Sequence, residues 1–192
     1  MQAMHLKYPG PGPEPTPMDR VRRISRWVRA MALVGGAALL LLTIGLWSSP
    51  EWIARIAANE AGLGGARIVV TPGVQWAGWL VSMVPVGVGL FALHQVWHLF
   101  GDYGRGAIFT PGATARLRRL AWSLIGVAAA QVLARTATGL VLTMNNPPGQ
   151  KVLLVGLSSH DYVLLLFGVL LLAIAWVMVE ATRLAQENAE FV

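Results

Sequence analysis

Four long apolar stretches constrain the fold of this chain more than any other feature of its sequence. They lie around residues 28–47, 76–99, 120–142 and 162–179, and a helix needs about 20 mainly apolar residues to cross a bilayer. Only 12% of the residues are charged, against about 25% in soluble domains. None of the stretches alternates with the period of two that a membrane β-barrel requires. The sequence therefore predicts an all-α integral membrane protein, with a four-helix bundle formed by residues 28–183.

The two flanking segments have different compositions. Residues 1–27 contain prolines at alternate positions from Pro9 to Pro17, followed by a run of arginines. Because closely spaced prolines prevent helix formation, we predict a disordered, proline-rich and basic tail there. Charged residues recur at helical spacing from Glu180 onward. This spacing predicts that the fourth span continues as a helix through residues 184–192.

The basic residues predict the orientation of the spans. Eleven of the 15 Lys and Arg residues lie in the two terminal tails and in the loop between the second and third stretches, whereas three lie in the other two loops. Positive charge collects on the cytoplasmic side of a membrane. All eight tryptophans fall near predicted span ends, where their amphipathic rings are favoured. We therefore predict a multi-pass protein of the bacterial inner membrane, with both termini in the cytoplasm.

Arg135 is the best functional candidate within the spans. No other Asp, Glu, Lys or Arg occurs from Leu120 to Gln150, and an arginine inside a membrane costs about 2.5–3.5 kcal/mol on insertion scales, so it generally has a partner. Gln131 lies one helical turn away, and Glu51 and Asp161 are the candidate acids. Counted from the end of its span, Arg135 lies about 13 Å deep, near the midplane. It is either a structural tie or part of a site for a ligand, ion or partner.

His94 and His98 are the second intramembrane candidates. Their spacing of four places them on one helix face, and histidine is a common metal ligand. Ordinary interfacial hydrogen bonding explains them as well, and a haem held by two histidines normally takes them from facing helices. The sequence has no cysteine, so a thiolate metal site or nucleophile is excluded. We predict no cofactor.

The loop between the second and third stretches is rich in glycine and arginine. Gly101, Gly104 and Gly106 are predicted to break a helix, and Thr110-Pro111 to cap and start the next one. A glycine loop with basic residues is one way to hold a phosphate, but this loop has no Walker motif, and a structural hairpin is the simpler interpretation. With the C-terminal helix, it is predicted to form a cytoplasmic partner surface that includes Arg105, Phe109, Arg116, Arg119 and Glu187.

The largest predicted outer loop covers residues 48–75. Ser49-Pro50-Glu51 predicts the start of a short amphipathic helix, and the run Arg67–Thr71 is β-prone. We interpret this loop as a lid over the spans, with an outward-facing sensor as the alternative. Close packing between spans is predicted at small residues, namely Gly87, Gly89, Gly126, Gly139 and Gly168.

Short motifs in the second half of the chain resemble a known family. They include Leu99-Phe100, Arg105-Gly106 and the run Arg116–Leu120, together with Glu187-Asn188 and Phe191-Val192. Residues 28–192 are similar to the bacterial four-span membrane family named domain of unknown function 2975. The resemblance implies four spans with both ends inside, and it carries over no catalytic residue. Some members are similar to partners of small helix-turn-helix regulators, which implies a signalling role.

Together these features predict a non-enzymatic regulatory, sensory or accessory subunit. Its expected partners are the lipid bilayer, a cytoplasmic regulator or another membrane subunit, and a second copy of the chain. The net charge of +6 is explained by topology, so no direct nucleic-acid binding is predicted. The alternative is a small redox component, binding haem or quinone, or a transport component that uses His94, His98 and Arg135.

Overall fold

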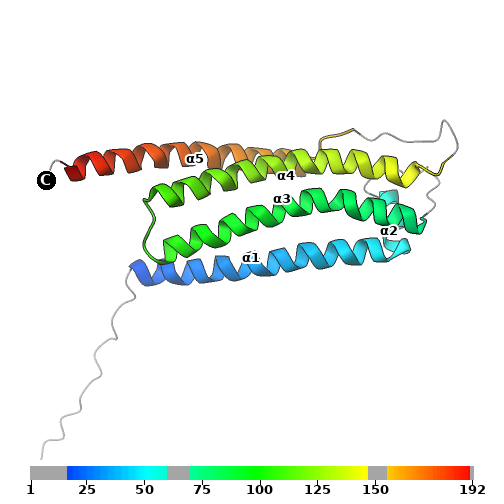
Figure 1. The fold of residues 1–192 in the computed structure, drawn as a ribbon, viewed down its shortest axis with the longest axis horizontal. Coiled ribbons are helices and arrows are strands. Elements are labelled where there is room, and N and C mark those ends of the chain that lie inside the picture. The colour runs from blue at the N-terminus through cyan, green and yellow to red at the C-terminus, as the bar shows by residue number, and fades with distance from the viewer. Residues whose placement is uncertain (1–16, 60–69, 147–154, 191–192) are drawn as a thin grey trace, which may run out of the picture.

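The structure is a computed structural model that describes residues 17–59, 70–146 and 155–190. Over those ranges it is helical apart from short connections, with no strand (Figure 1). Four of the five helices are long and apolar enough to cross a membrane. The all-α prediction with four membrane-capable helices is therefore confirmed. The helices are α1 (Pro17–Ser48), α2 (Pro50–Asn59), α3 (Pro72–Gly104), α4 (Pro111–Thr143) and α5 (Ser159–Glu190).

The four long helices lie side by side in a single layer, in the order of the chain (Figure 1). The extensive contacts join α1 with α3, α3 with α4, and α4 with α5. Helices α1 and α5 therefore form the two edges of the layer. We call the end that contains the start of α1, the α3–α4 turn and the end of α5 the basic end, and the end that contains α2 the opposite end. Both described ends of the chain lie at the basic end (Figure 1).

Two helices begin with the same local signal, a threonine followed by a proline. The hydroxyls of Thr71 and Thr110 accept from backbone N–H groups three residues later, and Pro72 and Pro111 begin α3 and α4. Proline is favoured at a first helical position because its missing N–H would be unpaired there anyway. The start predicted at Thr110-Pro111 is confirmed.

Two predicted boundaries differ from the structure. α1 begins at Pro17, so residues 17–27, predicted as disordered, are helical, because a proline in the first turn is tolerated and none follows it. α3 begins at Pro72 rather than near residue 76, and Thr71 is its cap rather than the end of a β-prone run. Residues 1–16 and 67–69 lie outside the described ranges.

The α3–α4 turn shows why one glycine prediction was wrong. Gly101 lies inside α3, which continues to Gly104, because a single glycine in a helix costs only about 1 kcal/mol relative to alanine. Gly106 has a φ of 84°, a conformation that glycine adopts without steric cost. Its N–H donates to the carbonyl of Tyr103 over 3.0 Å. The chain therefore reverses at Gly106.

Close packing between helices occurs at specific glycines. A Cβ added to Gly168 would lie 2.7 Å from Ile125 Cγ1 and 3.2 Å from the Ala121 carbonyl oxygen, so α4 and α5 approach closely there. A Cβ at Gly87 would meet nothing within 4 Å. The prediction that Gly87 is a packing point was therefore wrong, and the residue faces open space.

The opposite end contains a small packed cluster. Trp47 is buried and donates from Nε1 to Ser82 Oγ over 2.9 Å, and its ring packs directly against Gly78. Ile53 of α2, Val74 and Leu142 join it. Trp47 is thus used for packing, unlike the exposed Trp52 and Trp76 at the same end. The cluster holds α2 against the end of α1, the start of α3 and the end of α4.

Candidate functional site

Arg135 of α4 forms a bidentate ion pair with Asp161 of α5. Its Nη1 donates to Asp161 Oδ2 over 3.0 Å and its Nη2 to Asp161 Oδ1 over 3.1 Å. The same guanidinium reaches the carbonyl oxygen of Gly156 at 3.0 Å. The Asp161 side chain is 0% exposed, and that of Arg135 is 32% exposed. Parallel N–H···O bonds between these two groups fix their geometry as well as their charge.

The acid of this pair is also part of the start of α5. The N–H of Ser158 donates to Asp161 Oδ2 over 2.8 Å, and the N–H of Asp161 donates to Ser158 Oγ over 3.2 Å. This reciprocal arrangement is a capping box, with aspartate in the place of the usual glutamate. Ser158 therefore also holds the Asp161 carboxylate in position, and its negative charge lies near the positive end of the α5 dipole.

This pairing fixes the position of Arg135 relative to α5. Arg135 lies beside the first turn of α5, immediately before the apolar stretch that begins at Tyr162. The predicted depth was counted from the end of α4, and α4 continues beyond the level at which α5 begins. Of the two candidate acids, Arg135 contacts Asp161, whereas Glu51 is exposed on α2.

A cavity of about 840 Å³ lies between α1, α3 and α4 beside the ion pair. Gln131 and Thr138 of α4 line it together with Ser82 and Pro85 of α3. The cavity therefore brings Gln131 and Arg135 to one surface, as their spacing predicts. Because Arg135 already has a carboxylate, a carbonyl and the Ser158 hydroxyl as acceptors, its charge is balanced within the fold.

A second ion-pair region lies at the basic end, around Asp102 near the end of α3. Arg105 Nη2 contacts Asp102 Oδ1 at 2.6 Å, and Arg116 of α4 pairs with Asp102 Oδ2 through Nη1. Arg116 Nη1 also donates to the His98 carbonyl oxygen over 3.2 Å. One carboxylate thus joins both sides of the α3–α4 turn. We call these three residues the Asp102 clamp.

Asp102 did not emerge from the sequence as a site residue. A signal for it exists, because Asp102 is the one acid between Glu60 and Asp161. An isolated acid among basic residues at a predicted membrane border is a natural ion-pair partner. The predicted site residues Arg105 and Arg116 are brought together by it.

His94 and His98 lie against each other on α3. Their ring centroids are 4.4 Å apart at an interplanar angle of 67°. Among the residues that the structure describes, no group of three His, Cys, Asp or Glu side chains is arranged to hold a metal. His98 lies near the Asp102 clamp, at the other end of the layer from Arg135. The redox or transport alternative uses the two histidines and Arg135 together. The fold places the histidines and Arg135 at different ends of the layer.

The predicted partner surface is divided between the α3–α4 turn and α5. Phe109 in the turn is 63% exposed, and Arg119 is exposed on α4. Glu187 lies on the part of α5 that continues beyond its apolar stretch, 3.6 Å from the Arg183 Nε. Arg105 keeps most of its side chain exposed, whereas Arg116 is committed to the Asp102 clamp.

Four long apolar helices in one layer, with arginines concentrated at one end, define a multi-pass membrane protein. The sequence profile of the family described as "Protein of unknown function (DUF2975)" matches residues 66–192. The chain belongs to this family. The matched part contains α3, α4 and α5, together with both ion-pair regions, and leaves α1 and α2 outside. No curated protein and no solved structure matches the chain.

Proposed function

We propose that this chain is a non-enzymatic accessory or regulatory subunit of the bacterial inner membrane, with both termini in the cytoplasm. It acts through a partner that contacts the α3–α4 turn and the end of α5. The observation that carries the proposal is the extension of α5 to Glu190, well beyond its apolar stretch. A helix that leaves the membrane with charged residues offers a surface to a soluble protein.

The α3–α4 turn supports the same surface. The Asp102 clamp fixes the turn, and Phe109 is left 63% exposed within it. Exposed aromatic residues on a rigid support are frequent anchors of protein interfaces. The α5 extension adds Glu180, Arg183 and Glu187, which pair with one another along one helix face. The proposed surface thus has an aromatic centre and charged borders.

The other polar region supports a non-enzymatic role. Arg135 and Asp161 satisfy each other, and Ser158 supplies further hydrogen bonds. A catalytic arginine or carboxylate needs free donors or acceptors that face a substrate. The geometry therefore favours a structural role for this pair, which supports the basic end as the proposed binding region.

The partner surface is tested by capture from native membranes with quantitative mass spectrometry. Phe109→Ala and deletion of residues 184–192 are each expected to lower recovery of one and the same protein, while membrane insertion remains unchanged. Phe167→Ala is the matched control, because Phe167 is similarly exposed on the apolar part of α5. Equal recovery with Phe109→Ala and Phe167→Ala would contradict the proposed surface.

The orientation is tested by cysteine labelling in intact cells. The chain has no cysteine, so single cysteines give an unambiguous signal. Leu157 lies at the opposite end and is 80% exposed. A cysteine at this position, Leu157→Cys, is expected to react with an impermeant thiol reagent. Phe109→Cys at the basic end is expected to react only after the membrane is opened. The reverse pattern would place both termini outside.

A further inference from the structure

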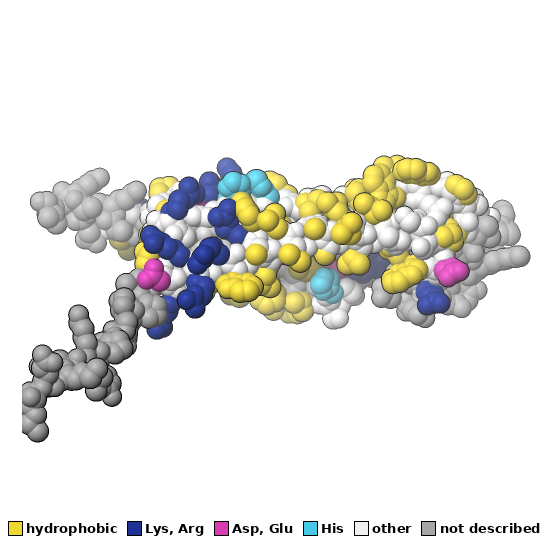
Figure 2. Space-filling view, turned by 90° about the horizontal axis from the view of Figure 1, so that it is seen from below, with side chains coloured by type: hydrophobic (Ala, Val, Ile, Leu, Met, Phe, Trp, Pro, Cys, Tyr) yellow, Lys and Arg dark blue, Asp and Glu magenta, His cyan; other side chains and the backbone are white. Residues whose placement is uncertain are grey.

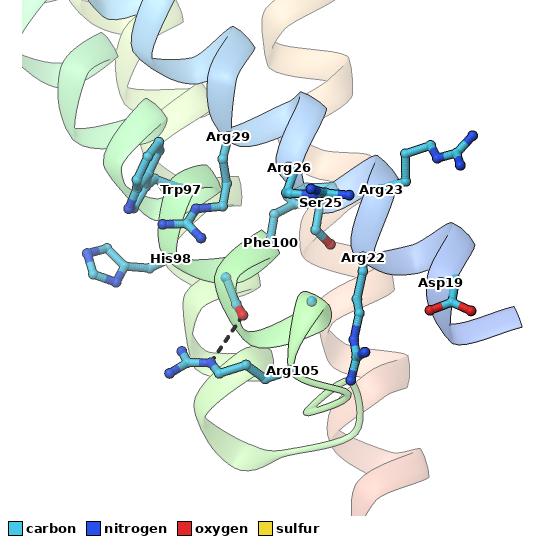
Figure 3. A pocket seen from close by; sticks show the side chains of 12 residues that line it. Asp19, Arg22, Arg23, Ser25, Arg26, Arg29, Trp97, His98, Phe100 and Arg105 are labelled. Carbon is cyan, nitrogen blue, oxygen red and sulfur yellow. Dashed lines mark hydrogen bonds between the residues drawn. The ribbon is translucent and has the colours of Figure 1, made fainter. Parts of the chain in front are cut away.

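A cavity of about 840 Å³ lies between α1 and α3 at the basic end. Arg22, Arg26 and Arg29 of α1 line it, and Arg105 closes it from the α3–α4 turn (Figure 3). Arg22 and Arg29 point from α1 toward α3, whereas Arg23 points away (Figure 3). Figure 2 shows Lys and Arg side chains gathered at this end of the molecule. Asp19 is the acid among the lining residues, so positive charge predominates.

Two buried donors beside this cavity have no hydrogen-bond partner among the residues that the structure describes. They are Ser25 Oγ and Arg29 Nε. Ser25 is only 3% exposed and its Cβ and Oγ pack against Gly104, where an added Cβ would lie 3.4 Å and 3.6 Å away. Arg29 stacks on Trp97, with its Cζ 4.0 Å from the ring centroid. Buried donors are normally paired, so their position indicates that an acceptor binds here.

A second cavity continues from the first into the membrane. It has a volume of about 490 Å³ and is lined by Leu33 and Gly36 of α1 and by Leu90 and Leu93 of α3. Trp97 and His98 line both cavities. The basic cavity and the apolar groove therefore meet at Trp97. Tryptophan favours the boundary between head groups and hydrocarbon.

We propose that an anionic phospholipid binds between α1 and α3. Its phosphate lies among Arg22, Arg26 and Arg29, and an acyl chain occupies the apolar groove above Trp97. Guanidinium groups bind phosphate oxygens through parallel N–H donors, and basic pockets between membrane helices are suited to anionic head groups. The lipid would add contacts between α1 and α3, the seam that joins α1 to the rest of the layer.

The continuous groove distinguishes a lipid from a free phosphate. Inorganic phosphate or a soluble phosphate ester would use only the arginines. A phospholipid uses the arginines and the apolar groove together, and its depth at the membrane border matches the position of Trp97. Variants in the two cavities therefore separate the two sources.

The test measures lipid binding by native mass spectrometry on the full chain in neutral detergent. Phosphatidylglycerol is expected to bind more tightly than phosphatidylcholine, whose choline group would approach the arginines. Arg22→Gln with Arg29→Gln is expected to weaken phosphatidylglycerol binding about fivefold per arginine, as about 1 kcal/mol per basic residue implies.

Arg118→Gln with Arg119→Gln removes the same charge from exposed positions on α4 and is the matched control. Arg22→Gln with Arg26→Gln, which alters only exposed side chains, should act in the same direction if Arg29→Gln impairs folding.

The groove is tested separately with Ala37→Phe. Ala37 is exposed and lines the groove, so a phenyl ring there should occupy it and weaken phosphatidylglycerol binding. Ala173→Phe, at an exposed position on α5, should leave binding unchanged. If the Arg22/Arg29 pair and the Arg118/Arg119 control pair weakened binding equally, only general charge would attract the lipid. That result would overturn the proposal. The proposal would also be overturned if Ala37→Phe left phosphatidylglycerol binding unchanged and inorganic phosphate raised the melting temperature as much as phosphatidylglycerol does. The ligand would then be a free phosphate.

Discussion

Helix α4 is tied to a neighbour by an ion pair near each end, and the two ties differ in how completely their charges are balanced. At the opposite end, one arginine meets one carboxylate, and Ser158 and the Gly156 carbonyl supply further hydrogen bonds. At the basic end, Asp102 lies between two arginines. The arginines of α1 line the cavity between α1 and α3 and add further positive charge there. A balanced pair stabilises the fold and offers little to a ligand. Excess positive charge is what an anionic ligand or partner can use.

The spacing of the two ties matches the membrane. Arg116 and Arg135 are nineteen residues apart, which is about 28 Å along a helix, close to the hydrocarbon thickness of about 30 Å. The two ties are therefore separated by about one hydrocarbon thickness. Their burial differs, since the Asp161 side chain is 0% exposed and that of Asp102 is 15% exposed.

The largest effect is expected from breaking the buried tie. Arg135→Leu leaves the Asp161 carboxylate buried without its counter-charge, and a broken buried pair costs about 3–5 kcal/mol. Thermal unfolding in detergent should show a large loss of stability. Adding Asp161→Asn, which keeps a capping oxygen, should recover part of the loss, with a coupling of about 1–3 kcal/mol. Additive losses in the double variant would mean that the two residues act independently.

A smaller effect is expected at the α4–α5 seam on which the buried tie depends. Gly168→Ala places a Cβ against Ile125 and the Ala121 backbone, and overpacking of this kind costs about 1–3 kcal/mol. Gly87→Ala is the matched control, because nothing lies within 4 Å of its added Cβ, and it should keep or raise the thermal stability. If the two substitutions gave the same stability, the close approach of α4 and α5 would not exist in the membrane protein.

The Asp102 clamp should contribute less than the buried tie. Asp102→Asn removes the carboxylate charge, but Arg105 and Arg116 remain partly exposed, and exposed pairs contribute about 0–1 kcal/mol. The expected loss is therefore about 1 kcal/mol or less, and it should shrink as salt is added. The loss in Arg135→Leu should change little with salt. Equal salt dependence at both sites would remove the distinction between them.

The smallest effect is expected on the α5 extension. Glu187→Gln removes one partner of an ion pair in which both side chains are more than half exposed. Such pairs contribute little to stability, so the melting temperature should stay the same. A clear drop would show that this part of α5 packs against another element and is not a free surface.

The sequence predicted the helices better than their contacts. Apolar length and the Thr110-Pro111 signal depend on neighbouring residues, so they can be read locally. The choice of Asp161 over Glu51 depends on which helix lies beside α4, and both acids fall near the same end of the layer. The lipid cavity was hidden for a similar reason. Charge asymmetry already explained the arginines of residues 19–29, and only the packing of α1 on α3 brings Arg29 onto Trp97.

The order of the helices in the layer has a consequence for biosynthesis. Because each long helix packs on the one made just before it, almost every contact can form as soon as the next helix enters the membrane, and such local contacts favour fast folding. The Arg135–Asp161 pair follows the same order, since its arginine is made with α4 and its acid arrives only with α5. Until α5 is inserted, the nascent chain carries an uncompensated charge on α4. A chain without α5 is therefore chemically distinguishable from one that contains it, and membrane proteases or chaperones that recognise an unpaired charge on a membrane helix would have a feature to act upon.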